Sequence, residues 1–480
     1  MPYLVVTDFK GGLDTRRSQD NSPSGTLFEA SNVHISRGGE VEKRFAFVRQ
    51  VELGDATVGL AATVSGPVTF GVGARPASLD ANVGYQDLAI TTGSPYPALI
   101  RILDWDIFGG KLYLTALYAD GTIAHWYDGL RVTDWTPPAP VSFPTSTDPQ
   151  YQPVMTRMNK MYAGAANFLF FSKLDDPRIW QVATPNGGQG YIDQSNIQGG
   201  AERVTGLAPY QGKLAAFSRR SVQIWDIDPD PAKYRLSQAL LNIGSNASRS
   251  IISFGDTDVF FLADSGVRSL RARDSSNTAA ASDIGTPVDS LITAEVQSMS
   301  AEAAAYVCST IEPRSGRYWL ALGRRIYVFS FFSSSRVSAW SRYDLSFSPT
   351  EFATVDRNQY VRGDDGWLYL YGGLTGTEYG SDYLCTVELS LLDGGKPATE
   401  KMVQGIDVSC TGAWEVRLGT DPANPDTREL IATVNRVTYG MERIAATGQG
   451  THFSYELKHQ GAGPATLNAL ATHYQPGGQD

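Results

Sequence analysis

The sequence has few cysteines and no long apolar run, and both shortages limit what the protein can be. Its three cysteines, Cys308, Cys385 and Cys410, lie far apart and form no CxxC pair. This spacing argues against a disulfide framework or a zinc site and fits a reducing cytoplasm. Tyr3–Val6 is too short for the core of a signal peptide, and no run approaches the roughly 18 apolar residues of a membrane span. We therefore expect no membrane span.

Charge is also scarce. Charged residues make up 19% of the chain, against roughly 25% in an average domain. The net charge of −10 argues against a protein that grips nucleic acid through its phosphates, which requires clustered Lys and Arg. What the chain does have is glycine (48 residues) and aromatic side chains (11%), a composition that favours short strands and tight turns. At 480 residues we expect two or three β-rich domains.

The stretch 111–129 shows the unit from which the chain is built. Two apolar runs flank Asp120-Gly121, a pair typical of a type I′ hairpin turn, in which both central residues need a positive φ. The residues on both faces of the first run are largely apolar, so we expect this hairpin to be covered on two sides, as in stacked sheets. Because a lone hairpin is marginally stable, it needs neighbours of the same kind.

Similar strand starts recur at intervals of roughly 50 residues, the spacing of β-propeller blades. Each combines a turn residue with an apolar or aromatic strand start: Gly110-Lys-Leu-Tyr113, Asn159-Lys-Met-Tyr162, Gly212-Lys-Leu-Ala215, Thr257-Asp-Val-Phe260, Gly316-Arg-Tyr-Trp319 and Gly366-Trp-Leu-Tyr369. Six starts predict an all-β fold with a six-bladed propeller over 59–385, and Val68–Val72 offers the start of another blade.

Three further segments complete the organisation. Residues 1–58 are rich in turns and form an N-terminal arm, which either pairs with the main sheet or docks neighbouring subunits. Near 286–299 the apolar period changes to that of a helix, with Thr286 as N-cap, Pro287 at N1 and Asp289 completing a capping box. Residues 386–480 alternate in the strand manner and predict a β-sandwich-like domain.

The sequence offers little chemistry. The five histidines are scattered, and we find no Walker loop, Rossmann fingerprint or nucleophile elbow. Asp226–Asp230 resembles a calcium loop, but Pro231 stands where that loop needs Gly. Carboxylates such as Asp104 and Asp106, checked as a glycosidase pair, lie beside turn-type residues. We therefore predict no catalytic, cofactor-binding or metal-binding residue.

Two stretches resemble the tail nozzle proteins of short-tailed bacteriophages, also called tail tubular protein B or tail stabilisation proteins. One lies in the leader and the other about 270 residues later, and they read Asp8-Phe-Lys-Gly-Gly-Leu-Asp-Thr-Arg-Arg17, Pro23-Ser-Gly-Thr-Leu27, Asn32-Val33 and Arg37-Gly-Gly-Glu-Val-Glu-Lys-Arg44, then Glu312-Pro-Arg-Ser-Gly-Arg-Tyr-Trp319, Arg325-Ile-Tyr-Val-Phe-Ser330 and Val337-Ser-Ala-Trp-Ser341. The sequence departs from the family at Phe45-Ala46, where Pro-Gly is expected.

The resemblance implies a structural virion protein: a homo-hexameric ring below the portal and head-to-tail adaptor, assembled in the bacterial cytoplasm, through which genomic double-stranded DNA leaves without specific binding. Tail fibres or spikes commonly attach around such a ring. Six copies at −10 each carry about −60, which favours repelling the DNA backbone. The basic pairs of the leader, Arg16, Arg17, Lys43 and Arg44, are the predicted assembly contacts.

Two other functions remain open at this stage. A carbohydrate-active propeller, such as a depolymerase, requires a channel-side cluster of Asp, Glu, Tyr and Arg. A protein-binding propeller scaffold requires a large exposed aromatic patch on one rim.

Overall fold

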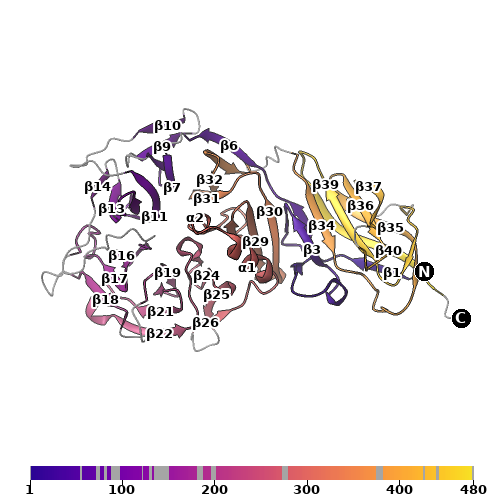
Figure 1. Cartoon of the computed structure of the whole chain (residues 1–480), viewed down its shortest axis with the longest axis horizontal. Coiled ribbons are helices and arrows are strands. Elements are labelled where there is room, and N and C mark those ends of the chain that lie inside the picture. Colours follow the sequence, from indigo (N-terminus) through magenta and orange to yellow (C-terminus); the bar gives the residue numbers. More distant parts are fainter. Residues whose placement is uncertain are drawn as a thin grey trace.

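The computed structural model describes residues 2–53, 57–71, 76–80, 84–87, 98–121, 123–128, 132–134, 151–180, 188–195, 202–272, 279–373, 382–424, 427–438 and 443–477. Figure 1 shows two parts side by side: a ring of small sheets, and a stack of strands that carries both chain termini at its far end. Nearly all of the regular structure is β, which confirms the predicted all-β class.

The ring is a β-propeller of seven blades in the described residues, each a four-stranded antiparallel sheet. The first strands of consecutive blades are neighbours, and β31 returns to β7 to close the circle. The first four blades are β7 (Thr57–Thr63), β8 (Gly66–Gly71), β9 (Pro76–Asp80) and β10 (Gly84–Asp87); β11 (Leu99–Phe108), β12 (Lys111–Tyr118), β13 (Ile123–Asp128) and β14 (Val132–Asp134); β15 (Val154–Arg157), β16 (Lys160–Ala165), β17 (Phe168–Phe171) and β18 (Gly190–Asp193); β19 (Gly206–Tyr210), β20 (Lys213–Phe217), β21 (Ser221–Asp226) and β22 (Arg235–Leu241).

The last three blades continue in chain order, but the seventh borrows its outer strand from the leader. They are β23 (Ile252–Phe254), β24 (Asp258–Ala263), β25 (Gly266–Ala272) and β26 (Ala279–Ser282); β27 (Cys308–Ile311), β28 (Tyr318–Leu322), β29 (Arg325–Phe332) and β30 (Val337–Asp344); β31 (Pro349–Val355), β32 (Asn358–Gly363), β33 (Trp367–Tyr371) and the leader strand β6 (Phe47–Glu52). Short 3₁₀ turns lie at Gln19–Asn21, Pro231–Lys233, Ser248–Ser250 and Ser333–Ser335.

The propeller prediction is confirmed, whereas the count of six blades is corrected to seven. The first five sequence markers open the second strands of blades two to six, but Gly366 opens β33, a third strand. Blade one was not among the six counted starts, because β8 begins Gly66-Pro67, where proline takes the place of the usual strand start. The further start noted at Val68–Val72 falls in β8, and Val72 lies outside the described residues.

The hairpin at 111–129 has the expected neighbours but a different turn. Leu112, Leu114 and Ala116 pack against blade one, and Tyr113 packs against blade three, so both faces of β12 are buried. Gly121 has a φ of 79°, but Asp120 is not in the left-handed region. The backbone N–H of Gly121 donates to the carbonyl of Tyr118 (2.9 Å), so the chain turns at Ala119-Asp120 and Gly121 follows. The type I′ prediction is therefore wrong; a longer loop with one left-handed Gly makes the connection.

The predicted helix is present between blades five and six as α1 (Asp289–Ser298), and a short helix, α2 (Ala301–Ala304), follows it. Val288 and Ile292 are fully buried against the propeller, as the apolar stripe predicted. The capping box is wrong. Val288 occupies the N-cap position, and the Thr286 hydroxyl donates to the Asp283 carbonyl. Asp289 instead accepts hydrogen bonds from the Val267 N–H (2.9 Å) and Arg268 (2.7 Å), because bonds within blade five compete with the cap.

The C-terminal part is a sandwich of two sheets with one core between them. One sheet has the order β38–β35–β40–β5–β4, with β1 also on β40; the other runs β3–β34–β39–β36–β37. Its strands are β34 (Cys385–Leu389), β35 (Lys401–Thr411), β36 (Trp414–Gly419), β37 (Glu429–Val434), β38 (Gly448–Gly450), β39 (Ser454–His459) and β40 (Thr466–Pro476). Trp414 and Leu457 from one sheet and Val408 and Leu470 from the other are fully buried in this core.

The leader belongs to both parts. Its strands are β1 (Tyr3–Val6), β2 (Gly12–Leu13), β3 (Thr26–Ser31), β4 (Val33–Ile35), β5 (Val41–Lys43) and β6. β1, β4 and β5 lie in one sheet of the sandwich, and β3 lies between β34 of the sandwich and β30 of blade six. The second sheet is therefore continuous with blade six (Figure 1).

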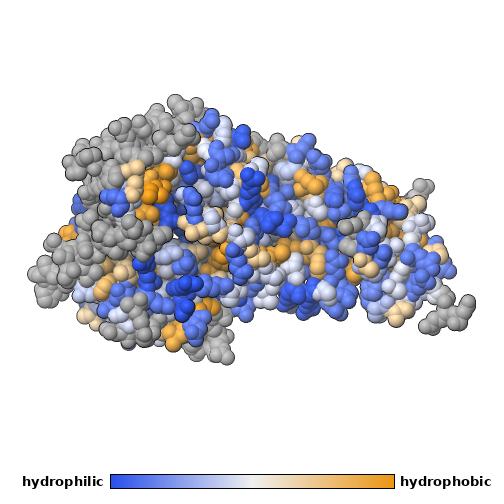
Figure 2. Space-filling view, viewed as in Figure 1, coloured by the Kyte–Doolittle hydropathy of each residue, from blue (hydrophilic) through white to orange (hydrophobic). Residues whose placement is uncertain are grey.

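The visible face of the molecule is mainly hydrophilic. Figure 2 shows small, separate apolar patches over the described parts of both domains. Scattered apolar residues of this kind are normal on a protein surface and by themselves mark no binding site.

Replacement of Phe47 by Ala should destabilise the propeller, because this residue of β6 packs against the rings of Trp319, Phe347 and Tyr371. Since Phe47 is half-buried, we expect a loss of about 2–3 kcal/mol, less than for a fully buried Phe. Chemical denaturation followed by tryptophan fluorescence measures it. Glu52→Ala, on an exposed residue of the same strand, is the control; equal stabilities of the two variants would contradict the role of β6 in closing the ring.

Candidate functional site

The predicted assembly residues separate into an exposed pair and a buried pair. Arg16 is exposed and forms an ion pair with Asp14 (3.0 Å), while Arg17 is exposed beside it. Lys43 and Arg44 are buried, at 2% and 5% exposure. The ends of these two side chains therefore serve contacts within the chain, and only Arg16 and Arg17 present charge at the surface.

Lys43 and Arg44 are held by carbonyls and aromatic rings where the propeller meets the sandwich. Lys43 Nζ donates to the carbonyls of Gly461 and Gly463, and burial lowers the pKa of this ammonium group. Arg44 Nε donates to Asn32 Oδ1 (2.8 Å), and its guanidinium lies 3.8 Å from the centroid of the Tyr383 ring. A buried guanidinium stacked on aromatic rings stabilises a joint more than a surface pair does.

The two stretches that carry the family resemblance meet in this joint. Arg317 Nη2 donates to the Ile35 carbonyl (3.2 Å) and lies 3.9 Å from the Glu42 carboxylate. Gly12, with a φ of 58°, lies so close to blade six that a Cβ atom on it would be 2.7 Å from the Trp340 carbonyl oxygen. Residues far apart in the sequence thus form one structural unit.

Within the described part of the chain, no group of three His, Cys, Asp or Glu side chains is arranged to hold a metal ion. None of the described helices is long and apolar enough to cross a membrane. Of the histidines, His34 is buried, and its Nδ1 lies 2.7 Å from the Tyr343 hydroxyl. Burial lowers the pKa of His34 to about 4, so its imidazole is neutral at pH 7.

The propeller channel holds carboxylates that the sequence had placed near turns. Asp104 and Asp106 lie within β11 and line a channel cavity of about 340 Å³. Asp104 accepts hydrogen bonds from the backbone N–H groups of Trp105 and Val154 (both 2.9 Å), and Asp106 accepts from those of Ile107 (2.7 Å) and Thr156 (2.5 Å). Because β15 is the innermost strand of blade three, its inward N–H groups have no partner strand. The two aspartates therefore link blade two to blade three.

Burial dominates the electrostatics of these carboxylates. It raises the pKa of Asp104 to about 7, against the lowering effect of its two N–H donors. It also raises the pKa of Asp106. Glu351, 1% exposed, pairs with Arg249 Nη1 at 3.2 Å, and burial raises the pKa of Glu351 while the arginine opposes that rise.

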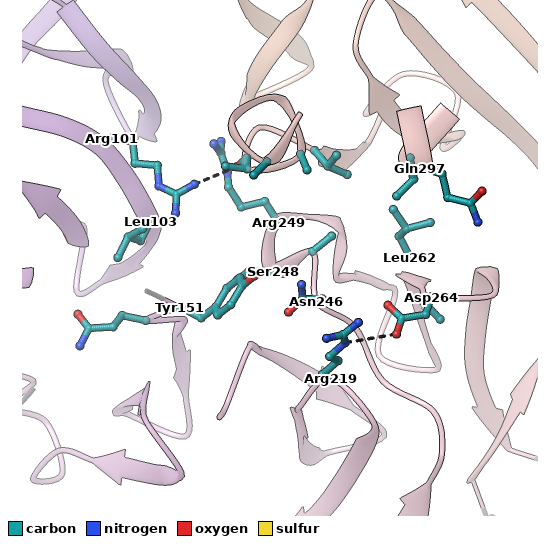
Figure 3. Close-up of a pocket in the computed structure, with 18 of the residues that line it drawn as sticks. Arg101, Leu103, Tyr151, Arg219, Asn246, Ser248, Arg249, Leu262, Asp264 and Gln297 are labelled. Atoms are coloured by element: carbon teal, nitrogen blue, oxygen red, sulfur yellow. Dashed lines mark hydrogen bonds and ion pairs between the residues drawn. The ribbon is translucent and has the colours of Figure 1, made fainter. Parts of the chain in front are cut away.

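A larger cavity of about 610 Å³ lies at the mouth of the channel, below α1 and α2 (Figure 3). Arg101 of blade two and Arg249, which precedes blade five, both line this cavity and lie close together in this view. Arg101 Nη1 donates to the carbonyl of Ala305, at the end of α2 (3.4 Å). Arg219 and Asp264, from turns of blades four and five, form an ion pair across the lower wall (3.3 Å).

Among the described residues, the propeller channel leaves no room for a DNA duplex. Its cavities measure about 340 and 610 Å³, and Arg101 and α2 meet across its mouth. A B-DNA major groove alone is roughly 12 Å wide. A conduit for DNA would therefore have to lie between copies of this chain.

Arg101, Arg249 and Glu351 were not among the residues singled out from the sequence. The available signal was the run Arg101-Ile-Leu-Asp-Trp-Asp106, in which charged residues interrupt an apolar strand. Only the ring, which brings the innermost strands together, shows that these side chains share one channel.

No family model matches this chain, and no curated protein matches its sequence. Among solved structures it is similar to BamB from Moraxella catarrhalis (12% identity, 71% of this chain and 90% of that one, TM-score 0.37) and to YCF48 bound to D1 peptide (9% identity, 73% and 99%, TM-score 0.39). Both TM-scores lie below 0.5. The propeller assignment rests on the strand pairing of this chain itself.

Replacement of Asp104 by Asn should cost about 1–3 kcal/mol, because one of the two oxygens that accept the backbone N–H groups becomes an NH₂ group, which cannot accept. The loss should depend on pH. The folded pKa, about 7, is raised from 3.8, so the stability that the carboxyl contributes is fully present below pH 3.8 and is lost as the pH rises through about 7.

The melting-temperature advantage of the wild type over Asp104→Asn should therefore shrink between about pH 4 and pH 8. Differential scanning calorimetry measures it, with Asp175→Asn, on an exposed loop of blade three, as the control without such a trend. An advantage that grows with pH would contradict the raised pKa.

Replacement of Gly12 by Ala should weaken the joint between the leader and blade six. The added Cβ would meet the Trp340 backbone, on top of the strain of a positive φ, a clash that costs about 1–3 kcal/mol. Gly395→Ala is a matched control, because Gly395 has a φ of 70° but no atom within 4 Å of such a Cβ. Limited proteolysis and thermal unfolding should find Gly12→Ala less stable than Gly395→Ala; equal stabilities would show that the leader does not press on blade six.

Proposed function

We propose that this chain is a structural virion protein, the distal tail nozzle of a short-tailed bacteriophage. Six copies form a ring that conducts and gates genomic double-stranded DNA on its way out of the capsid. The ring docks onto the head-to-tail adaptor below the portal, with tail fibres or spikes as further partners. The protein catalyses no reaction, binds no cofactor, and acts in the virion tail after assembly in the host cytoplasm.

The observation that carries this proposal is the contact between the two stretches that resemble the nozzle family. Gly12 lies against Trp340, and Arg317 reaches Ile35 and Glu42. Chance matches far apart in a sequence have no reason to meet in the fold. Residues that form one structural joint do, so the contact supports the resemblance.

Because the propeller channel is narrow, we propose a DNA conduit that lies between copies of the chain and not inside one propeller. Because α2 and Arg101 meet at the propeller mouth, each propeller is a wall element, and the DNA path runs along the axis of the ring. A net charge of −10 per copy keeps the phosphate backbone from adhering where acidic side chains line that path. Arg16 and Arg17, exposed at the start of the leader, are the assembly contacts proposed here.

A carbohydrate-active propeller finds less support. Asp104 and Asp106 do line one channel cavity, together with Arg249, the ion-pair partner of the buried Glu351. However, each aspartate accepts one backbone N–H group from its own strand and one from blade three, and Glu351 is paired with Arg249. These bonds leave the aspartates little capacity for general acid or base work. For a protein-binding scaffold, the face in Figure 2 offers only small apolar patches.

The purified chain mixed with its adaptor ring should give a hexamer by native mass spectrometry. Reversal of charge in Arg17→Glu should reduce the hexamer fraction several-fold, because a glutamate at this exposed position would repel the acidic surface of the neighbouring copy that the proposal places against Arg17. Arg235→Glu, on the outer strand of blade four with 80% side-chain exposure, should leave the fraction unchanged.

A chain that stays monomeric in the presence of the adaptor would refute the nozzle proposal. Release of reducing sugar from host capsule or lipopolysaccharide would favour the depolymerase instead. An unchanged hexamer in Arg17→Glu would remove Arg17 from the assembly surface without affecting the ring.

A further inference from the structure

The cavity at the propeller mouth has the size and the lining of a ligand site. Its volume of about 610 Å³ falls within the roughly 300–1,000 Å³ of small-molecule pockets. Residues from blades two, four and five and from α1 and α2 surround it. It is distinct from the proposed DNA path and from the leader joint, so its role does not depend on the nozzle assignment.

Arg101 lines this cavity, and its guanidinium is only partly satisfied. Nη1 donates to the Ala305 carbonyl (3.4 Å), and Nε is buried without a hydrogen-bond partner among the described residues. Nη2 is not buried in this way and keeps its N–H donors for an oxygen of a ligand carboxylate. A buried donor left unsatisfied costs free energy, and a ligand that satisfies it recovers that cost.

Of the three arginines around the cavity, only Arg101 has no carboxylate partner among the described residues, so the site favours a ligand with a single negative charge. Arg249 is paired with Glu351 (3.2 Å), and Arg219 is paired with Asp264 (3.3 Å). Arg101 has no carboxylate within salt-bridge distance among the described side chains, and its nearest charged neighbours include Arg249. Burial and the like charge of Arg249 both lower the pKa of Arg101. One unpaired cation fits a monoanion better than a doubly charged phosphate.

The rest of the wall is mostly apolar. Leu103 and Leu262 face the cavity from blades two and five, Val296 from α1, and Ala304 and Val307 from α2 and the segment that follows it. Figure 3 shows Leu103 and Leu262 on opposite sides of the space that Arg101 enters. An apolar body held between these walls would gain roughly 25 cal/mol for each Å² it buries.

We propose that this cavity binds a small apolar monocarboxylate. Nη2 of Arg101 holds the carboxylate, and the apolar part lies between Leu103, Leu262 and Val296. The ligand is either a free acid or the last residue of a peptide chain, because both present the same head and the same kind of body. In either case it joins blade two to α2 across the channel mouth and stabilises the propeller when bound.

The test compares 4-phenylbutyrate with its neutral isostere 4-phenylbutyramide on the full-length protein, by calorimetric titration and by thermal shift. We expect the acid to bind at least about tenfold more tightly than the amide, the factor of one good charged hydrogen-bond pair. N-acetyl-phenylalanine is the peptide-end probe. If it binds more tightly than phenylbutyrate, the natural ligand is a chain end; if phenylbutyrate binds more tightly, the ligand is a free acid.

Variants of Arg101 locate the head group. Arg101→Met keeps the aliphatic stem and should remove the preference for acid over amide, whereas Arg101→Lys keeps the charge but loses the planar guanidinium and should retain only part of that preference. Arg178→Met, on an exposed arginine of blade three, should bind like the wild type. Equal binding of acid and amide to the wild type would overturn the proposal even if Arg101→Met failed to fold. Acetate binding as tightly as phenylbutyrate would overturn the apolar part.

Discussion

The pairing of β6 with β33 is the constraint on which the rest of the architecture depends. A ring of blades is closed only if its last sheet is completed, and here the leader supplies the outer strand of blade seven through pairs such as Val48 with Leu370. Because β6 is fixed there, the residues before it must leave the ring next to blade six. They cross to the sandwich as β5, β4 and β3. The same leader segment therefore both closes the propeller and attaches the sandwich to it.

The same problem of unpaired strand edges recurs at the centre of the ring. Each innermost strand has one edge with no partner strand, and between blades two and three Asp104 and Asp106 supply the missing acceptors. Burial makes these carboxylates costly, as the raised pKa of Asp104 shows. They are retained because an unsatisfied backbone N–H in the channel would cost about as much. The two aspartates are thus explained by backbone geometry before any chemistry is invoked.

The spacing of apolar residues predicted which faces of a strand or helix are buried. It failed where residues distant in the sequence compete for the same hydrogen bonds or cover the same side chains. The two-sided burial of β12 and the apolar stripe of α1 follow from side-chain period alone. Asp289 fits a capping box by spacing, but Arg268 and the Val267 N–H take its carboxylate. Lys43-Arg44 has the pattern of a surface pair, yet rings from Tyr383 and Tyr343 bury it. Pairings such as β6 with β33 cannot be predicted from the sequence of either strand, because the alternation of apolar residues identifies a strand but not the strand that pairs with it.

The joint between the two domains is held by more than its strand pairing. β3 meets β30 through a single backbone bridge, Ser31 with Arg342, and Arg342 also pairs with Glu29 of β3 (2.7 Å). One bridge and one ion pair add little to stability by themselves. Beneath them, however, a single buried apolar cluster runs from Trp340 of blade six through Leu27 of β3 to Val387 of the sandwich. Separation of the propeller from the sandwich would expose these side chains, so the free energy of apolar burial, more than the β ladder, holds the two domains together.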